Sequence, residues 1–559
     1  MSDRHMNSKR TPDGIVVPGH FQTPLPMDRL IVRTSPDDES VPMDVLFVGG
    51  GPAGLAGAIE LARLIRNDEG LRDIEIGVLE KASTLGEHCL SGAVVDISPM
   101  RELFPDVAIA DLPLRGAIPA ERVYLLTDGR RIRIPTPPPM QNHGHHVASI
   151  CEIVRWMGER AEDAGINVFT GFPADSLLMD EGRVVGVRTV PSGLGRDGTP
   201  GADYMPPTDV TARVTVLTEG SRGPLTQAWM AEQGIRSPNP QIYALGVKEL
   251  WQVPRPLETV IHTLGYPLPR DAFGGSWMYP MGEGTVSLGL VVGLDYRQTT
   301  LDVHELLQTL KQHPLFRDVL AGGEMVEWGA RTIPEGGYYS IPERLSGDGL
   351  IVAGDAAGLV DVASLKGIHY AMYSGMYAAR AIYSALKADR TDAASLASYD
   401  ETVRDSQVMR DLYERRNLRL SFKSGFYAGG LKSSLAIVTK GRIPGGRIAV
   451  ESDADEPKRT TPAKPFRPDG ELTFSKLDAV FRSGNATRDD VPSHLLAAVD
   501  IPREVGELYS HLCPAGVYEW SAEGLVINAP NCIDCRATDV LGPRWTPREG
   551  GSGPSYKRM

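Results

Sequence analysis

The chain has 559 residues, of which 42% are hydrophobic, and this length predicts two to four domains rather than a single core. Its 71 acidic and 58 basic residues give a formal net charge of -13, which argues against nucleic acid as a partner. The five cysteines are irregularly spaced and do not form a disulfide framework, so a reducing compartment is expected.

The N-terminal 40 residues are polar and rich in proline, and we expect an arm that is extended or docks onto the rest of the protein. They carry Asp3 and Asp13 and no apolar stretch, so no targeting peptide is evident. No window of 18 uninterrupted apolar residues occurs, which argues against a membrane-spanning helix and leaves attachment to a membrane surface open.

Residues 43–65, "MDVLFVGGGPAGLAGAIELARLI", predict a buried strand, a glycine turn and an apolar helix. Gly49, Gly51 and Gly54 occupy the glycine positions of G-x-G-x-x-G. In this fingerprint the first glycine permits the tight turn, the second lets a pyrophosphate approach the backbone, and the third lets helix and strand pack closely. Glu80 closes the next strand, at 74–82, and is a candidate ligand for a ribose hydroxyl.

Two later segments favour FAD over NAD as the bound nucleotide. Residues 214–223, "VTVLTEGSRG", resemble the flavoprotein segment that returns to the nucleotide, and "LIVAGDAAGLVD" offers Asp355 to the ribityl chain. A helix beginning near Gly367 would point its positive end at the flavin ring and stabilise the anionic reduced form. The alternative for Asp355 is a helix N-cap.

The rest of the chain suggests further units. Residues 149–165 have helical periodicity. Strand-like runs between about 240 and 335, interrupted by a helical stretch at 301–313, predict a separate and largely β module. Residues 450–470 have the composition of a linker.

The C-terminal unit contains three cysteines in a suggestive arrangement. Cys532 and Cys535 form a C-x-x-C pair, and Cys513 lies 19 residues before the first of them. A cubane iron–sulfur cluster takes four ligands, but the position where a fourth cysteine would be expected carries Thr538.

These motifs occur in one order that resembles the electron transfer flavoprotein–ubiquinone oxidoreductase family, within the wider group of geranylgeranyl reductase-like flavoproteins. The resemblance spans residues 42–556 and includes "EKASTLGEHCLSGAVVD", "NHGHH", "AFGGSWMYP", "GARTIPEGGYYSIP" and "CPAGVYEW". It implies an α/β (overall α+β) chain with a Rossmann-type FAD domain in discontinuous segments, a mostly β quinone-binding domain and a ferredoxin-like iron–sulfur domain.

The resemblance also suggests domain boundaries. They are an arm at 1–40, the FAD domain at 41–238 and 345–425, the quinone-binding domain at 239–344, a membrane-surface segment at 426–450, a linker at 451–470 and the cluster domain at 471–559.

The implied activity is an electron relay from reduced electron transfer flavoprotein, through an iron–sulfur centre and FAD, to a membrane quinone. By resemblance, Gly274 and Gly275 in "FGGSW" would meet the quinone; the alternative for this pair is a β-bulge or turn. No catalytic acid or base is expected at the flavin, because electron transfer depends on distance and potential. The location implied is peripheral, at the cytoplasmic face of a bacterial inner membrane.

Two features depart from the family pattern. The segment after residue 420 combines apolar side chains with lysines and arginine, which fits a helix lying on a membrane surface or, alternatively, one packed on the protein. The cysteine site leaves three outcomes: Asp539 or water completes a [4Fe–4S] cluster, three thiolates hold [3Fe–4S], or the site is a relic. A zinc site formed by the cysteines and His511 is a fourth, formal possibility.

Two other functions stay open. One is a FAD-dependent reductase of an isoprenoid or other apolar small molecule, which would not need the cluster. The other is a non-catalytic scaffold that docks the flavoprotein partner without relaying electrons.

Overall fold

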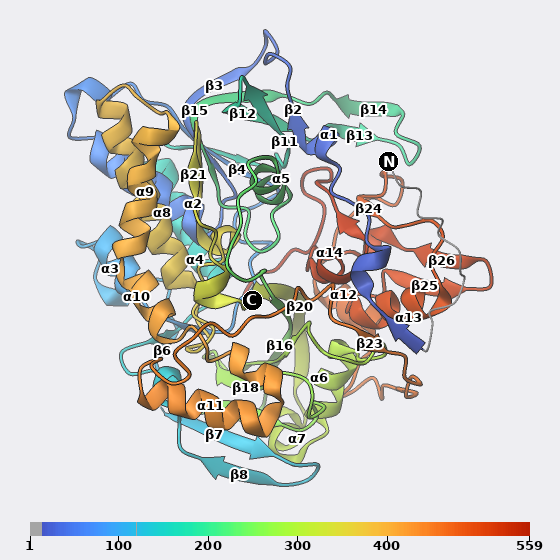
Figure 1. The fold of residues 1–559 in the computed structure, drawn as a ribbon. Helices are drawn as coiled ribbons and strands as arrows, with labels where there is room; N and C mark the ends of the chain where they lie inside the picture. The colour runs from blue at the N-terminus through green and yellow to red at the C-terminus, as the bar shows by residue number, and fades with distance from the viewer. Residues whose placement is uncertain (1–13, 119) are drawn as a thin grey trace.

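The computed structural model describes residues 14–118 and 120–559, and these form an α/β structure in three parts (Figure 1). A sheet covered by helices comes first, a second sheet lies below it in the view, and a small C-terminal unit lies at the right. This arrangement agrees with the predicted fold class. The first 13 residues of the predicted N-terminal arm lie outside the described residues.

The first sheet is parallel at its centre, in the order β10–β4–β3–β15, with β22 also parallel to β15. Val45 to Val48 of β3 are buried, as expected where helices cover both faces of a parallel sheet. The strands of this sheet are β2 (Ile31–Val32), β3 (Val41–Val48), β4 (Ile76–Glu80), β10 (Asn167–Thr170), β11 (Ala174–Asp180), β12 (Arg183–Thr189), β15 (Asp209–Leu217), β21 (Ser346–Gly347) and β22 (Leu350–Val352).

Two helices that are far apart in sequence pack against each other on this sheet. They are α2 (Pro52–Ile65) and α8 (Ile368–Lys387), and a Cβ on Gly375 would lie only 2.1 Å from the carbonyl oxygen of Ala53. Glycine therefore permits the close approach that brings the start of α8 beside the glycine turn. The helices around them are α3 (Ser98–Leu103), α4 (Ile150–Asp163), α5 (Pro224–Glu232), α9 (Ala393–Asp405) and α10 (Gln407–Glu414).

The second sheet has seven strands in the order β20–β16–β19–β18–β17–β7–β8. Their bounds are β7 (Glu121–Leu126), β8 (Arg131–Ile134), β16 (Tyr243–Gln252), β17 (Val260–Gly265), β18 (Gly274–Pro280), β19 (Thr285–Gly293) and β20 (Glu324–Pro334). The helical stretch predicted at 301–313 is present as α6 (Val303–Lys311), followed by α7 (Pro314–Leu320). Strands β7 and β8 come from outside the range 239–344, so the sheet recruits an upstream hairpin.

The C-terminal unit is short of regular structure and shares one hydrophobic core with the second sheet. Its elements are α12 (Lys476–Arg482), α13 (Arg503–Leu512), α14 (Ala537–Leu541), β24 (Leu495–Leu496), β25 (Tyr518–Ser521), β26 (Gly524–Ile527) and β27 (Arg544–Trp545). The chain end then returns to the first part, where the Met559 carbonyl oxygen accepts a hydrogen bond from Ser149 Oγ at 3.1 Å.

The segment with linker composition is anchored rather than free. Asp453 and Lys458 are buried, and Lys458 Nζ donates to the carbonyl oxygens of Leu294 (2.9 Å) and Tyr296 (2.7 Å). The remaining short elements are β1 (Ile15–Val16), α1 (Met27–Leu30), β5 (Val94–Val95), β6 (Gly116–Ala117), β9 (His146–Val147), β13 (Ser192–Leu194), β14 (Pro200–Met205) and β23 (Lys458–Arg459). No helix in the described part of the chain has the length and apolar character needed to cross a bilayer.

Candidate functional site

One cavity of about 740 Å³ joins all three parts of the protein. Its volume is within the range of small-molecule and cofactor sites. Most of the residues predicted to contact cofactor or quinone line it: Gly49, Gly51, Glu80, Gly274, Gly275, Asp355 and Gly367. Gly54 is the exception and lies behind the turn. The sequence motifs therefore meet in space although more than 300 residues separate the first from the last.

The three fingerprint glycines are required for different reasons. Gly49 has φ +117°, and a Cβ there would lie 2.4 Å from the carbonyl oxygen of Thr218. A Cβ on Gly54 would lie 2.1 Å from the Gly49 carbonyl oxygen, so this glycine lets α2 pack on the turn. Gly51 is the N-cap of α2, and a Cβ there would meet nothing within 4 Å. The open space at the positive helix end fits a pyrophosphate.

Glu80 lies at the end of β4 and borders this turn. Its Oε2 accepts from the backbone N–H of Gly50 at 3.0 Å, and its Oε1 accepts from Ala82 N–H at 2.8 Å. These bonds fix the carboxylate at the cavity edge, and each oxygen keeps acceptor capacity for a ribose hydroxyl.

Asp355 and Gly367 also line the cavity. A Cβ on Gly367 would lie 3.8 Å from Asp355 Oδ1. Burial raises the pKa of Asp355 to about 6, opposed by the positive charge of Arg331. Helix α8 is capped by Gly367 without a side-chain hydrogen bond, so the alternative that Asp355 caps it is wrong. The free helix end faces the cavity, as a flavin ring would require.

The second sheet contributes β18 and the neighbouring strand β17. A Cβ on Gly274 would lie 2.1 Å from the Val291 carbonyl oxygen, so close strand packing is one reason for a glycine there. His262 and Tyr279 also line the cavity, with the Tyr279 hydroxyl 3.2 Å from His262 Nδ1. Burial lowers the pKa of His262 to about 3, aided by the charge of Lys366, so this imidazole is neutral at pH 7. Sequence reasoning missed this pair, because no motif contains His262 and the motif "AFGGSWMYP" drew attention to Gly274 and Gly275 rather than to Tyr279.

Helix α11 (Phe426–Val438) lies beside the second sheet (Figure 1), and it contributes to the cavity wall. Phe426, Gly430 and Ile437 line the cavity. Large apolar side chains are exposed away from the cavity: Leu431 (74%), Leu435 (43%) and Val438 (81%). Tyr427 (69%) is exposed as well and lies at the cavity edge. The helix thus exposes a row of large apolar side chains to solvent, which is unusual for a surface helix.

The three cysteines of the C-terminal unit are buried and surrounded by backbone N–H groups. Those of Ala515 and Val517 point at the Cys513 thiol, and Asp534 N–H points at Cys532. Burial raises the pKa of Cys532 to about 12, so the thiol is protonated unless a metal compensates the thiolate charge. Such N–H groups stabilise metal-bound thiolates, and the loop fits an iron–sulfur cluster.

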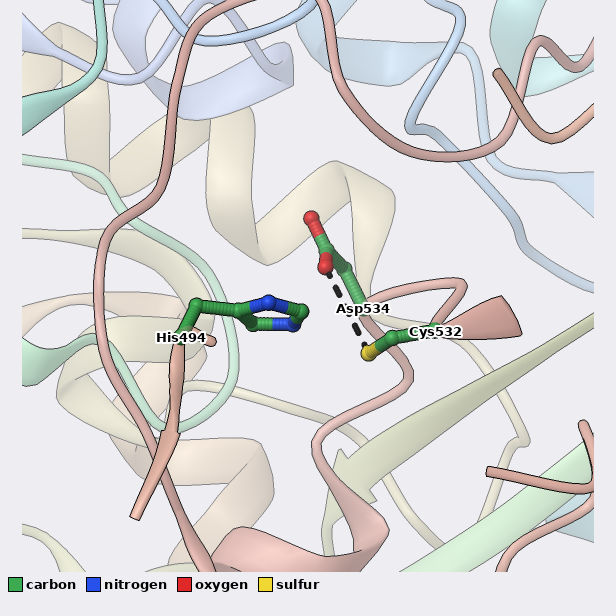
Figure 2. A group of neighbouring side chains, drawn as sticks. All are labelled: His494, Cys532 and Asp534. Carbon is green, nitrogen blue, oxygen red and sulfur yellow. Dashed lines mark hydrogen bonds between the residues drawn. The ribbon is translucent and has the colours of Figure 1, made fainter. Parts of the chain in front are cut away.

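The thiols are too far apart for a single ion. Among residues 14–118 and 120–559, the one group of three potential ligands within 4.8 Å of one another is His494, Cys532 and Asp534 (Figure 2). The zinc site considered with His511 is therefore wrong; His511 Nδ1 lies 3.6 Å from Asp302 instead.

The group in Figure 2 is not a separate metal site. Asp534 is neutralised by Lys81 and by Arg548, whose Nη2 lies 2.8 Å away, and Oδ1 accepts from Trp545 Nε1 at 3.0 Å. These bonds hold the cysteine loop rigidly against the rest of the protein.

The cysteine loop also reaches the cavity. Arg536 and Trp545 line the cavity, with the Arg536 guanidinium 3.2 Å from the centre of the Trp545 ring. The backbone N–H of Thr332 in the second sheet donates to the Cys535 carbonyl oxygen at 2.9 Å. The cysteine loop and the glycine turn therefore border the same cavity.

Comparisons with known proteins agree with this geometry. Residues 243–333 match the family model described as "ETF-QO, ubiquinone-binding", and residues 470–557 match "Electron transfer flavoprotein-ubiquinone oxidoreductase, 4Fe-4S". The chain is 37% identical to the mitochondrial electron transfer flavoprotein-ubiquinone oxidoreductase of Oryza sativa subsp. japonica, covering 93% of this chain and 94% of that one. It is 36% identical to the Homo sapiens protein, covering 92% and 89%.

A solved structure of a geranylgeranyl bacteriochlorophyll reductase-like protein from Thermoplasma acidophilum has the same fold, with a TM-score of 0.57 and 19% identity. It covers 72% of this chain and 96% of that chain. At this identity the likeness shows the fold alone.

The predicted location at the cytoplasmic face of a bacterial inner membrane is wrong. The relatives that cover more than nine tenths of this chain, from rice, Dictyostelium discoideum, yeast and human, are named mitochondrial. Nothing in the residue pattern distinguished the two membranes.

Proposed function

The chain belongs to the electron transfer flavoprotein–ubiquinone oxidoreductase family, and on this premise we propose that it oxidises reduced electron transfer flavoprotein and reduces a membrane quinone. FAD and a 4Fe–4S cluster supply the redox chemistry when bound. The observation that carries the proposal is the shared cavity, because it connects the glycine turn, the second sheet, α11 and the edge of the cysteine loop.

The roles of individual residues follow from their places around this cavity. Gly49, Gly51 and Gly54 build the pyrophosphate turn, and Glu80 accepts from the ribose. Asp355 bonds the ribityl chain, and the α8 N-terminus at Gly367 faces the flavin ring. These assignments rest on open space at Gly51 and on the uncapped start of α8.

The quinone head group would occupy the part of the cavity between β18 and α11. Gly274 and Gly275 expose backbone there, and the wall formed by α11 is largely apolar, as an isoprenoid tail requires. Gly430 lines this part of the cavity, and a Cβ on it would meet no atom within 4 Å. The space beside Gly430 is the proposed quinone path.

The exposed face of α11 is the proposed membrane contact. Its four apolar side chains lie at spacings that place them on one side of the helix, and Lys432, Lys440 and Arg442 are exposed nearby. A helix of this kind lies in the head-group region, and each basic residue adds about 1 kcal/mol on an anionic surface. A quinone could then pass from the lipid, under α11, into the cavity.

The direct test is steady-state reduction of a short-chain ubiquinone by enzymatically reduced electron transfer flavoprotein. The Gly430→Leu variant should raise the KM for quinone while electron uptake from the flavoprotein stays at the wild-type rate. The matched control is Gly446→Leu, since Gly446 also has open space but lies outside the cavity.

Failure would take distinct forms. FAD-loaded protein that binds electron transfer flavoprotein without reducing quinone would favour a scaffold. Saturation of a prenyl double bond, with no response to the flavoprotein, would favour the small-molecule reductase. No observation on the described residues favours either of these over the relay.

A further inference from the structure

The cluster loop of this chain has three thiols where a cubane needs four ligands. Of the five cysteines, Cys89 and Cys151 belong to the core of the first part. Cys151 Sγ lies 3.1 Å from the Cys89 carbonyl oxygen and 3.4 Å from that of Met559. The fourth ligand must therefore be something other than a cysteine.

The nearby carboxylates are committed elsewhere. Asp539 is buried; its Oδ2 accepts from Arg222 Nε at 2.7 Å, and its Oδ1 accepts from the backbone N–H of Trp545 at 3.1 Å. Asp534 is held by Lys81 and Arg548. Withdrawing either carboxylate would leave buried arginine charge unpaired, which is strongly unfavourable.

Two buried hydroxyl groups, on Thr538 and Tyr518, lie in the same unit as the thiols. Thr538 stands in the first turn of α14, three residues after Cys535, and its Oγ1 lies 3.3 Å from the Tyr518 hydroxyl. Tyr518 is buried and belongs to the same hydrophobic core as Cys513, Cys532 and Cys535. The hydroxyl pair and the three thiols thus lie in one buried part of the C-terminal unit.

We propose that Thr538 faces the fourth iron of the cluster, so that three irons are held by thiolates and the fourth by oxygen. The inference rests on the proposed function, because it presumes the 4Fe–4S cluster. A neutral hydroxyl is a hard and weak ligand for iron in a sulfide cluster, whereas thiolate is soft and strong. The fourth iron is therefore exchangeable, and the other three are not.

This asymmetry has a defined chemical consequence. When the [4Fe–4S]²⁺ cluster loses one electron to ferricyanide, it releases one Fe²⁺ to a chelator and leaves [3Fe–4S]⁺. The three cysteine–iron bonds stay intact. The bonds that break are those of the fourth iron to three sulfides and to the Thr538 oxygen, and the chelator replaces these ligands on the released Fe²⁺. The charge balances, since the one electron and the one Fe²⁺ together account for the change from 2+ to 1+.

The experiment compares iron release in four proteins that retain FAD. Anaerobically purified wild type and the Thr538→Cys, Thr538→Ser and Ser521→Cys variants are treated with ferricyanide and a ferrous chelator. Iron and sulfide are then counted per FAD, and EPR of the oxidised sample is recorded at low temperature. Ser521→Cys is the control for an added thiol, because Ser521 lies at the turn of the β25–β26 hairpin and bonds Gly524.

The expected result is a loss of about one iron in four from wild type, with an oxidised-state EPR signal of [3Fe–4S]⁺. Thr538→Ser and Ser521→Cys should behave in the same way. Thr538→Cys should keep four irons and give no oxidised-state EPR signal after the same treatment.

Two results would overturn the inference. Equal iron release from wild type and Thr538→Cys would place the fourth ligand elsewhere, with His494 the next candidate because a ring nitrogen lies within 4.8 Å of the Cys532 thiol. The proposed electron relay would survive this outcome. Protein that holds FAD but no iron, in every variant, would refute the inference and the cluster part of the relay together.

Discussion

Two glycines of the fingerprint should fail in opposite ways when each is replaced by alanine. A Cβ on Gly54 would lie 2.1 Å from the Gly49 carbonyl oxygen and 2.8 Å from Thr218 Oγ1, so backbone has to move. Overpacking of this kind lowers the free energy of unfolding by about 1–3 kcal/mol. FAD is then lost because the turn itself is distorted.

Gly51→Ala meets no protein atom within 4 Å, and its backbone has φ -83° and ψ -173°, which alanine accepts. The FAD-free protein should be as stable as wild type or more stable by about 0.4–1 kcal/mol, since alanine restricts the unfolded chain. The methyl group would occupy the space proposed for the pyrophosphate, so FAD affinity should fall steeply even though the fold is intact.

The assay has two readouts for each variant. FAD content and FAD affinity are measured by flavin fluorescence, and urea unfolding is followed on FAD-free protein by circular dichroism. Loss of FAD with unchanged apo-protein stability in Gly51→Ala, and loss of both in Gly54→Ala, would support the reasoning. Normal FAD binding by Gly51→Ala would refute the placement of the pyrophosphate.

Three further predictions concern burial. Burial lowers the pKa of His262 from 6.5 to about 3, so the unfolded chain binds a proton that the folded protein does not, and stability falls as the pH drops below 6.5. Between pH 7 and pH 5 the free energy of unfolding should fall by about 2 kcal/mol on account of His262, and His262→Gln should remove this part of the pH dependence. Lys311→Met should lower the free energy of unfolding by about 3–5 kcal/mol, because it leaves the fully buried Glu249, 2.8 Å from Lys311 Nζ, without its counter-charge. Adding Glu249→Gln to this variant should restore part of the lost stability. Leu431→Glu and Val438→Glu should each weaken binding to anionic vesicles about tenfold or more, since burial of such side chains is worth about 1.5–3 kcal/mol.

Each of these predictions has its own control. Urea unfolding at pH 7 and pH 5 checks the first, and equal pH dependence in wild type and His262→Gln would contradict it. The second uses the exposed pair Arg503–Glu507, where Glu507→Gln should leave stability unchanged. The third uses sedimentation with vesicles; Val499→Glu alters an exposed side chain of the C-terminal unit and should leave binding intact.

Local patterns in the sequence predicted the nucleotide-binding elements well. The strand, turn and helix at 43–65 correspond to β3 and α2, and the helix predicted at 149–165 is α4. Both depend on short-range spacing of apolar residues and glycine. The family and the cofactors followed from motifs in a fixed order, and the comparisons confirmed them.

Contacts between segments far apart in the sequence could not be predicted from local patterns in this way. Strand β7 joins β17 in parallel, with Val260 opposite Glu121, and no local signal in either strand specifies that partner. The composition of residues 451–470 suggested a linker, yet Lys458 is buried because two carbonyl oxygens receive its ammonium group. His262 and Tyr279 become neighbours only through the register of β17 and β18. The predicted domain boundaries and residue roles stay predictions.

The central claim is that a quinone occupies the cavity between β18 and α11. The most direct measurement is to irradiate FAD-loaded protein with a photoreactive ubiquinone analogue and to map the labelled peptides by mass spectrometry, with and without excess unlabelled quinone. We expect competed labelling in the peptides that hold Gly274–Pro280 and Phe426–Val438. Labelling that falls outside these two segments, or that unlabelled quinone does not reduce, would contradict the account.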